Sequence, residues 1–225
     1  MFVHTYGQAQ NYIVKKTPFS SKKNAEFSPQ FYHNGLVFST DLDRILFEYS
    51  NAGEKGFLNI FFVDTTRKEN RQRPDLFSKN LNSKLNEGPV TFNSRRDTIY
   101  FSRNLFIEGS VNKLSSQWNK LGIFSAVLVD GEWNNIREFR FNSEWYNTTT
   151  PCLSPDGRRL YFASDMPDGY GGLDLYYSEW KNGFWNEPVN LGPMINSSGN
   201  ESYPWISPAG ELIFSSDGHP GMGGK

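Results

Sequence analysis

A fourfold internal repeat constrains this chain more than any other feature of its sequence. Each copy contains a proline, a short apolar segment, a turn, and a second apolar segment that ends in Phe-Ser or Phe-Ala. The copies occupy residues 27–41, 88–104, 150–165 and 203–217. Their closing phenylalanines are Phe38, Phe101, Phe162 and Phe214, at separations of 63, 61 and 52 residues. This periodicity predicts a fold built from four similar units.

Each copy has the pattern of a β-hairpin, and the third copy shows it best. A short strand ending at Leu153 precedes the turn Ser154-Pro155-Asp156-Gly157, and residues 159–164 return as an aromatic-rich strand. Proline presets φ in such a turn, Asp bonds the neighbouring backbone, and Gly accepts a positive φ. The fourth copy keeps this turn at 207–210, whereas the second copy, at 93–97, has the weakest turn signal.

A second repeated unit follows the hairpins. In the third copy, residues 173–178 alternate between apolar and polar, 181–183 predict a turn, and Phe184-Trp185 opens a strand that runs to Leu191. The second copy matches over 121–139, with Trp133 in the place of Trp185. In the first copy, 57–63 supplies a third strand and 75–77 a weakly marked fourth.

Four short antiparallel strands, repeated about every 50–60 residues, are typical of the blades of a β-propeller. We therefore expect an all-β propeller with blades at about 25–80, 86–142 and 149–192 and a partial blade at 200–225. Stacking of blades explains an aromatic content of 16% without any cofactor. Because closure takes about four to eight blades, three and a half blades predict an incomplete propeller or a piece of a longer one.

The N-terminal segment, residues 1–24, stands outside the repeats. Gly7 to Gln10 are small and polar, like the end of a signal peptide, although a charged start and an apolar stretch are missing. Residues 12–19 are suited to a closing outer strand for the last blade.

Charge and hydropathy exclude several classes of protein. The 23 Lys and Arg nearly balance the 24 Asp and Glu, so no field of one sign draws the chain to nucleic acid. No stretch of 18 apolar residues is available to span a bilayer. The single cysteine, Cys152, cannot form an internal disulfide, and we interpret it as a buried apolar residue.

The repeats also resemble a known family. Residues 153–180, LSPDGRRLYFASDMPDGYGGLDLYYSEW, and the stretch from Trp185 to Gly224 resemble the TolB-type, WD40-like (Pro-Asp) propeller repeat. The version they resemble occurs in envelope proteins of Bacteroidetes that also carry an OmpA-like peptidoglycan-binding domain. The similarity is weaker between Asp41 and Gly88. The repeat-signature residues, to which we assign a structural role, are Pro151, Ser154, Pro155, Asp156, Gly157, Phe162, Gly171, Gly172, Trp185, Pro204 and Phe214.

The resemblance implies a periplasmic, outer-membrane-associated scaffold that binds envelope proteins. Some members of the family belong to the type IX secretion machinery. Contact with peptidoglycan would come through a domain that this sequence does not contain. No cofactor is implied.

The acidic, glycine-rich loop from Asp165 to Asp174 is the best candidate for a metal site. Asp165, Asp168 and Asp174 are hard oxygen ligands of the kind that bind Ca²⁺, but their spacing is not that of an EF-hand. The fourth copy keeps the glycines and lacks a counterpart of Asp168. A structural connection between strands is the favoured interpretation, and metal binding remains the alternative.

Catalysis has weak support in the sequence, so we predict that the chain is not an enzyme. The three histidines, His4, His33 and His219, form no recognisable arrangement with Cys152. A Gly-x-Ser-x-Gly elbow is missing. Carboxylates for glycoside hydrolysis would have to come from different blades, with candidates Asp41, Asp43, Glu144 and Asp165. The alternative function is the substrate-binding propeller of a multidomain peptidase or glycosidase.

Binding is the better prediction, because propeller loops present side chains on a rigid frame. Candidate anchors are Phe106, Ile107 and Trp118 in the longest insertion, together with Trp145 and Tyr146 near a blade junction. Packing against the next blade is the alternative role for these aromatics.

Overall fold

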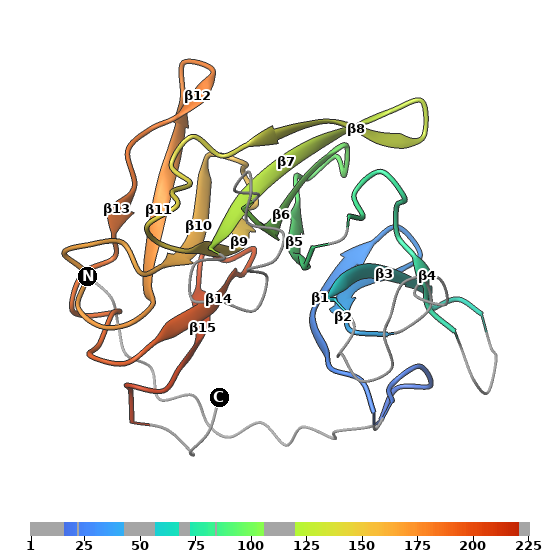
Figure 1. Cartoon of the computed structure of the whole chain (residues 1–225), viewed down its shortest axis with the longest axis horizontal. Helices are drawn as coiled ribbons and strands as arrows, with labels where there is room; N and C mark the ends of the chain where they lie inside the picture. The colour runs from blue at the N-terminus through green and yellow to red at the C-terminus, as the bar shows by residue number, and fades with distance from the viewer. Residues whose placement is uncertain are drawn as a thin grey trace.

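Figure 1 shows the computed structural model of the chain, which describes residues 16–21, 23–42, 57–67, 73–83, 85–105 and 120–220. All the regular secondary structure in these ranges consists of β-strands. The strands form four antiparallel sheets, which follow one another in chain order around a common centre (Figure 1). The all-β prediction is therefore confirmed. The signal-like residues Gly7 to Gln10 and residues 12–15 of the predicted closing strand lie outside the described residues, and the described remainder, 16–19, is not part of a strand.

The first two sheets have four strands each, and every strand pairs with the one before it in the chain. The first sheet contains β1 (Glu26–Tyr32), β2 (Gly35–Thr40), β3 (Asn59–Asp64) and β4 (Asp75–Leu76). The second contains β5 (Glu87–Phe92), β6 (Thr98–Asn104), β7 (Leu121–Val129) and β8 (Glu132–Glu138). In each sheet, the first two strands are the hairpin that the repeat predicted.

The third sheet contains β9 (Thr148–Leu153), β10 (Arg159–Ser164), β11 (Asp174–Lys181), β12 (Phe184–Trp185) and β13 (Val189–Asn190). The predicted fourth strand is thus divided in two, and both parts pair with β11. Pro188 lies between them and has no N–H to donate to a strand ladder. The fourth sheet has only β14 (Glu201–Ile206) and β15 (Leu212–Ser216) within the described part of the chain.

The hairpin turns follow the predicted chemistry. The N–H of Gly157 donates to the carbonyl of Ser154 at 2.8 Å, and Gly157 has a φ of +71°. The weakly marked second copy has the same backbone bond, from the N–H of Arg96 to the carbonyl of Asn93 at 2.9 Å. Side-chain bonds add to it, because the N–H groups of Asp97 and Thr98 both donate to Asn93 Oδ1, at 3.0 and 3.1 Å.

Two of the hydrophobic clusters lie between sheets, and a third, formed by Phe38, Phe61 and Val63, belongs to the first sheet alone. One cluster joins the first two sheets and includes Val37, Phe101 and Trp133. A second joins the second and third sheets and includes Ile123, Phe162 and Trp185. Each tryptophan belongs to the outer strand of its sheet and packs toward the sheet before it, as Trp185 does against Tyr100 at 5.8 Å. Stacking of the sheets therefore buries the aromatic side chains.

A repeated polar clasp ties each sheet together and links it to its neighbour. In each sheet, an Asp or Asn lies at the end of the second strand or directly after it: Asp41, Asn104, Asp165 or Asp217. Its side chain accepts the backbone N–H of a residue just before the first strand. In the last three sheets that N–H belongs to an asparagine. The side-chain oxygens of these asparagines accept the N–H of Leu58, Leu121 and Leu173 in the preceding sheet, at 2.9, 3.0 and 3.1 Å.

Candidate binding surfaces

The first strands of all four sheets line a common space, which we call the central hollow. Its volume is about 490 Å³. Its lining comprises Phe27, Ser28, Pro29, Gln30, Pro89, Thr150, Pro151, Tyr203, Pro204, Trp205 and Ser215. None of these described lining residues carries a charge. Phe27 and Tyr203 meet edge to face across the hollow at 6.1 Å, so the first and fourth sheets contact each other there.

A backbone irregularity is repeated around the central hollow. The first strand of each sheet contains one residue with a positive φ. These residues are Ser28, Gly88, Thr150 and Tyr203, at +53°, +97°, +51° and +51°. Each precedes one of the four lining prolines, and the pairing register of each strand shifts at this point. Such β-bulges bend a strand and re-aim its side chains. The repeated proline is visible in the sequence, but we did not predict the bulge from it, although a proline within a strand is a known sign of one.

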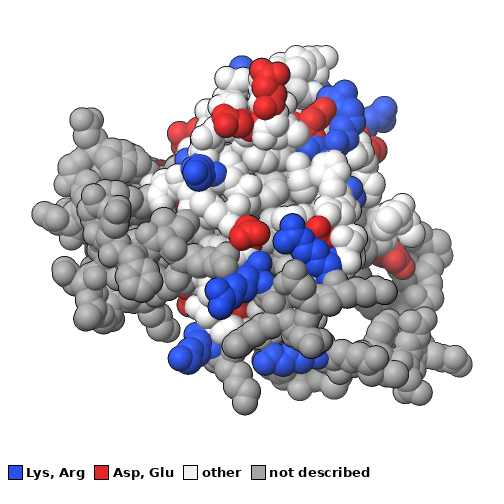
Figure 2. Space-filling model, turned by 90° about the vertical axis from the view of Figure 1, so that its right-hand side faces the viewer, with Lys and Arg blue, Asp and Glu red and all other residues white. Residues whose placement is uncertain are grey.

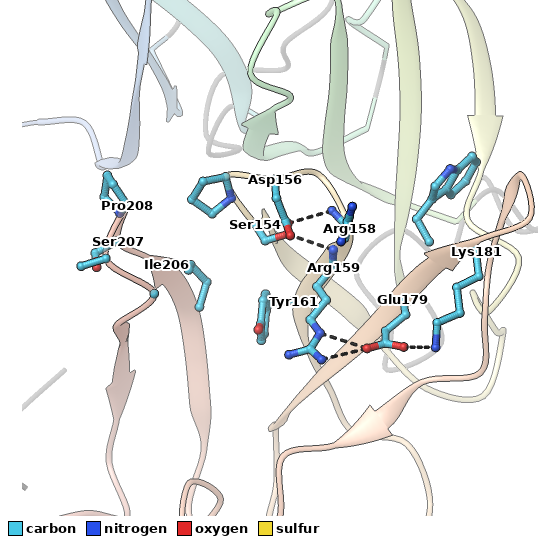
Figure 3. Close-up of a pocket in the computed structure, with 14 residues that line it drawn as sticks. Ser154, Asp156, Arg158, Arg159, Tyr161, Glu179, Lys181, Ile206, Ser207 and Pro208 are labelled. Carbon is cyan, nitrogen blue, oxygen red and sulfur yellow. Dashed lines mark hydrogen bonds and ion pairs between the residues drawn. The ribbon is translucent and has the colours of Figure 1, made fainter. Parts of the chain in front are cut away.

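A second opening, the side pocket, lies between the third and fourth sheets and has a volume of about 820 Å³. Figure 3 shows Tyr161 between Ile206 of β14 on one side and Arg159 and Glu179 on the other. Pro208 and Pro155, from the turns of the two hairpins, lie at its rim. The pocket is therefore walled by two sheets and combines apolar and charged groups.

Three of the charged residues that line the side pocket, Arg159, Glu179 and Lys181, form ion pairs with one another. Arg159 reaches Glu179 Oε1 with Nε at 3.1 Å and Nη2 at 2.8 Å, and Lys181 bonds the other carboxylate oxygen. These hydrogen bonds from Lys181 and Arg159 lower the pKa of Glu179. Arg159 also lies over the ring of Tyr177, with Cζ 4.8 Å from its centroid. This network fixes one wall of the side pocket.

In the loop predicted as a metal site, two of the three candidate carboxylates accept hydrogen bonds from the protein itself. Asp174 is 1% exposed and accepts the N–H groups of Tyr170 and Gly171 and the side-chain amide of Asn190. Asp165 accepts both the backbone and the side-chain N–H of Asn147. Asp168 lies in an exposed turn with a φ of +66°. Within the described ranges, no three His, Cys, Asp or Glu residues form a group that could hold a metal ion.

The glycines of this loop allow the third and fourth sheets to approach. A Cβ on Gly171 would lie 2.3 Å from the carbonyl oxygen of Gly199, and one on Gly172 would lie 2.3 Å from Asn200 Oδ1. These positions therefore require glycine for close packing between sheets.

The other residues singled out in the sequence are spread over the structure. Of the glycosidase candidates, Asp41 and Asp165 serve in the polar clasp, Glu144 is exposed, and Asp43 lies outside the described residues. Phe106, Ile107 and Trp118 also lie outside them. Trp145 is 73% exposed, whereas the hydroxyl of Tyr146 donates to the carbonyl of Phe141 at 3.2 Å. Of those that the structure describes, none lines the central hollow or the side pocket.

The histidines and the cysteine are likewise apart. His219 Nε2 lies 2.8 Å from the carbonyl oxygen of Ile195, while Cys152 is 5% exposed between the third and fourth sheets. His33 is in the turn between β1 and β2, and His4 falls outside the described part of the chain.

Among the described residues on the face shown in Figure 2, basic and acidic side chains lie near one another. A search of the described residues for a helix long and apolar enough to cross a membrane finds none.

No protein-family model matches the chain, and no curated protein matches it. Several solved structures, by contrast, are similar to the chain in fold. The putative TolB of Agrobacterium tumefaciens has a TM-score of 0.50 at 16% identity, over 81% of this chain and 50% of that one. A thermostable family-43 glycoside hydrolase has a TM-score of 0.52 at 13% identity, over 85% of this chain and 65% of the hydrolase. The chain thus spans about half the length of the TolB structure. Its stacked sheets and these neighbours together show a β-propeller fold, present here as an incomplete propeller.

Proposed function

We propose that this chain is the propeller module of a periplasmic, outer-membrane-associated scaffold, which binds other envelope proteins and catalyses no reaction. The observation that carries the proposal is the central hollow. It is uncharged over its described lining and presents Tyr203 and Trp205, which are 42% and 44% exposed. Aromatic side chains on a rigid frame are typical anchors of protein interfaces.

The same lining argues against hydrolysis in the hollow. A glycosidase needs two carboxyl groups on either side of the scissile bond, and a nucleophilic hydrolase needs a base beside its nucleophile. The described residues of the hollow supply neither. Two of the four carboxylates that the sequence offered, Asp41 and Asp165, serve instead in the polar clasp.

The cellular setting of the proposal rests on the repeat sequence and on the fold shared with a TolB structure. We extend it to the Bacteroidetes envelope family with OmpA-like domains, and to protein secretion, on the resemblance of residues 153–224. Any binding of peptidoglycan would belong to a separate domain.

Photocrosslinking in intact cells tests the proposal. Benzoylphenylalanine at Tyr203 or Trp205 of the full chain should capture one envelope protein, whereas the same group at Met194, 76% exposed and outside the hollow, should not. Equal capture from Met194, or recovery of the chain away from the envelope, would overturn the proposal. Release of sugars or peptides by the purified chain would favour the alternative, a propeller module of a hydrolase.

A further inference from the structure

The chain contains two Asn-Gly dipeptides, Asn34-Gly35 and Asn182-Gly183. In this dipeptide the backbone nitrogen of glycine can attack the side-chain carbonyl carbon of asparagine, because glycine has no Cβ to obstruct the approach. The attack requires a nitrogen that is accessible and free of hydrogen bonds. Both dipeptides lie at hairpin turns, so their positions within the turns decide which of them can react.

Asn182-Gly183 is the two-residue loop at the tip of the β11–β12 hairpin, at the top of Figure 1. Lys181 and Phe184 are paired on either side of the loop, and the φ values of Asn182 and Gly183 are +56° and +86°. Such a turn is closed by a hydrogen bond between its flanking residues, which does not use the N–H of the second loop residue. Both loop residues are exposed, and a Cβ on Gly183 would meet nothing within 4 Å. The nitrogen of Gly183 is therefore accessible to the side chain of Asn182.

Asn34-Gly35 is placed differently in its turn. Gly35 is a strand residue paired with Tyr32, so it follows the loop and stands at the position whose N–H closes a two-residue turn. Gly35 is also buried, and a Cβ there would lie 2.1 Å from the carbonyl oxygen of Val63. Strand pairing and packing therefore hold the nitrogen of Gly35 away from the side chain of Asn34.

We propose that Asn182 is a site of spontaneous deamidation whose isoaspartyl product loosens the packing of Trp185. The nitrogen of Gly183 forms a bond with Cγ of Asn182, and the side-chain nitrogen leaves as ammonia with the proton that Gly183 loses. Water then opens the resulting succinimide at either carbonyl carbon, which gives aspartate or isoaspartate. The reaction needs water alone, and the inference does not depend on the function proposed for the central hollow.

The two products affect the hairpin differently. Aspartate leaves the backbone unchanged, and the second sheet already has Asp130-Gly131 in the equivalent loop, with φ values of +52° and +81°. Isoaspartate routes the main chain through its Cβ and so lengthens a loop that is closed tightly by the paired strands. β12 consists only of Phe184–Trp185, and the Trp185 ring packs against Tyr100 of the second sheet at 5.8 Å. A lengthened loop therefore displaces a residue that fills the space between the second and third sheets.

Mass spectrometry of the full chain, aged in mildly alkaline water labelled with heavy oxygen, tests the site. Peptide maps should show label at Asn182 first, and at Asn34 about tenfold more slowly or less, because its turn must open before the nitrogen can attack. Gly183→Ala should slow labelling of Asn182 about tenfold, since a Cβ obstructs that nitrogen. Gly131→Ala, in the equivalent loop of the second sheet, is the matched control and should leave the rate unchanged. Equal rates at Asn34 and Asn182 in the native chain would overturn the inference.

Hydrogen exchange tests the structural consequence. Aged chain enriched in isoaspartate at position 182 should exchange its Phe184 and Trp185 amides about tenfold faster than fresh chain, as local opening becomes easier. Asn182→Asp should exchange like fresh chain, because aspartate fits this loop. Asn182→Gln, whose side chain would have to close a larger ring, should stay unlabelled and replaces Gly183→Ala if that variant folds poorly. Unchanged exchange at Trp185 in the isoaspartyl chain, or equally fast exchange in Asn182→Asp, would contradict the proposed loosening.

Discussion

Glu87 of β5 and Arg103 of β6 form an ion pair across neighbouring strands of the second sheet, and the Glu87 carboxylate is completely buried. Arg103 Nε lies 3.3 Å from Glu87 Oε1, and Nη2 donates to the carbonyl of Leu81 at 2.6 Å. Desolvation raises the pKa of Glu87 to about 7, against the opposing effects of Ser83 and Arg103. The same burial lowers the pKa of Arg103.

The pair makes stability depend on pH. Because the folded state raises the pKa of Glu87 from 4.5 to about 7, its contribution is fully present below pH 4.5 and is lost as the pH rises through 7. We expect this group to lower the free energy of unfolding by on the order of 3 kcal/mol across that range. Glu87→Gln should remove this part of the slope in urea titrations. A difference between wild type and Glu87→Gln that stays constant with pH would contradict the assignment.

Glu201 holds the corresponding place in the fourth sheet and behaves differently. Although burial raises its pKa, hydrogen bonds from Ser197 and Ser216 together hold the pKa below its usual value. Two glutamates at one repeat position therefore differ in pKa because desolvation outweighs hydrogen bonding at Glu87 and is outweighed by it at Glu201.

The hydrogen bonds between Asn147 and Asp165 make it possible to distinguish a structural role of Asp165 from metal binding. Asp165→Ala leaves both N–H groups of Asn147 without their acceptor, so we expect it to cost about 1–3 kcal/mol of stability. Asp165→Asn should cost much less, because Asn104 accepts the same two N–H groups from Asn86 in the second sheet. Urea titrations of both variants measure the difference. A rise in melting temperature with Ca²⁺ that Asp165→Asn abolishes would instead restore the metal interpretation.

The parts of the fold that the sequence predicts are those with local causes. Ser154-Pro155-Asp156-Gly157 specifies its turn through its own backbone preferences, and the alternation before Lys181 specifies a strand. The correspondence of Trp133 with Trp185 was visible because both follow a turn that ends in glycine. Repetition made each of these signals stronger.

The unpredicted parts depend on contacts between distant segments. Asp165, at the end of the second strand of its sheet, has a counterpart in every repeat of the sequence. Its hydrogen-bond partner, Asn147, lies 18 residues earlier, so the sequence pattern did not reveal the bond. The side pocket requires Tyr161 and Ile206 to face each other across two sheets, which no local pattern encodes. The central hollow likewise exists only once four first strands meet.

Cys152 should be unreactive in the folded protein. It is 5% exposed, and burial raises the pKa of its thiol to about 11. At pH 8 its thiolate fraction is then on the order of 0.1%, and the thiolate is the reactive form. We expect Ellman's reagent to modify it slowly in buffer and at once in guanidinium chloride. Rapid stoichiometric modification of the native chain would show that the third and fourth sheets do not cover it.

Gly88 and Gly131 offer a matched test of the bulges around the central hollow. Both have positive φ, at +97° and +81°. A Cβ on Gly131 would meet nothing within 4 Å, whereas one on Gly88 would lie 2.0 Å from the buried Oγ of Ser39 in the first sheet. Gly131→Ala should therefore cost about 1 kcal/mol, from backbone strain alone.

Gly88→Ala should cost about 3 kcal/mol or more, because the clash with Ser39 adds to the same strain. Denaturant titrations of the two variants measure the comparison. Ser39→Ala in the Gly88→Ala background removes the contacting oxygen and should recover part of the loss, which keeps the test open if the single variant is poorly folded. Equal costs at the two glycines would mean that the first and second sheets are not packed closely at this bulge.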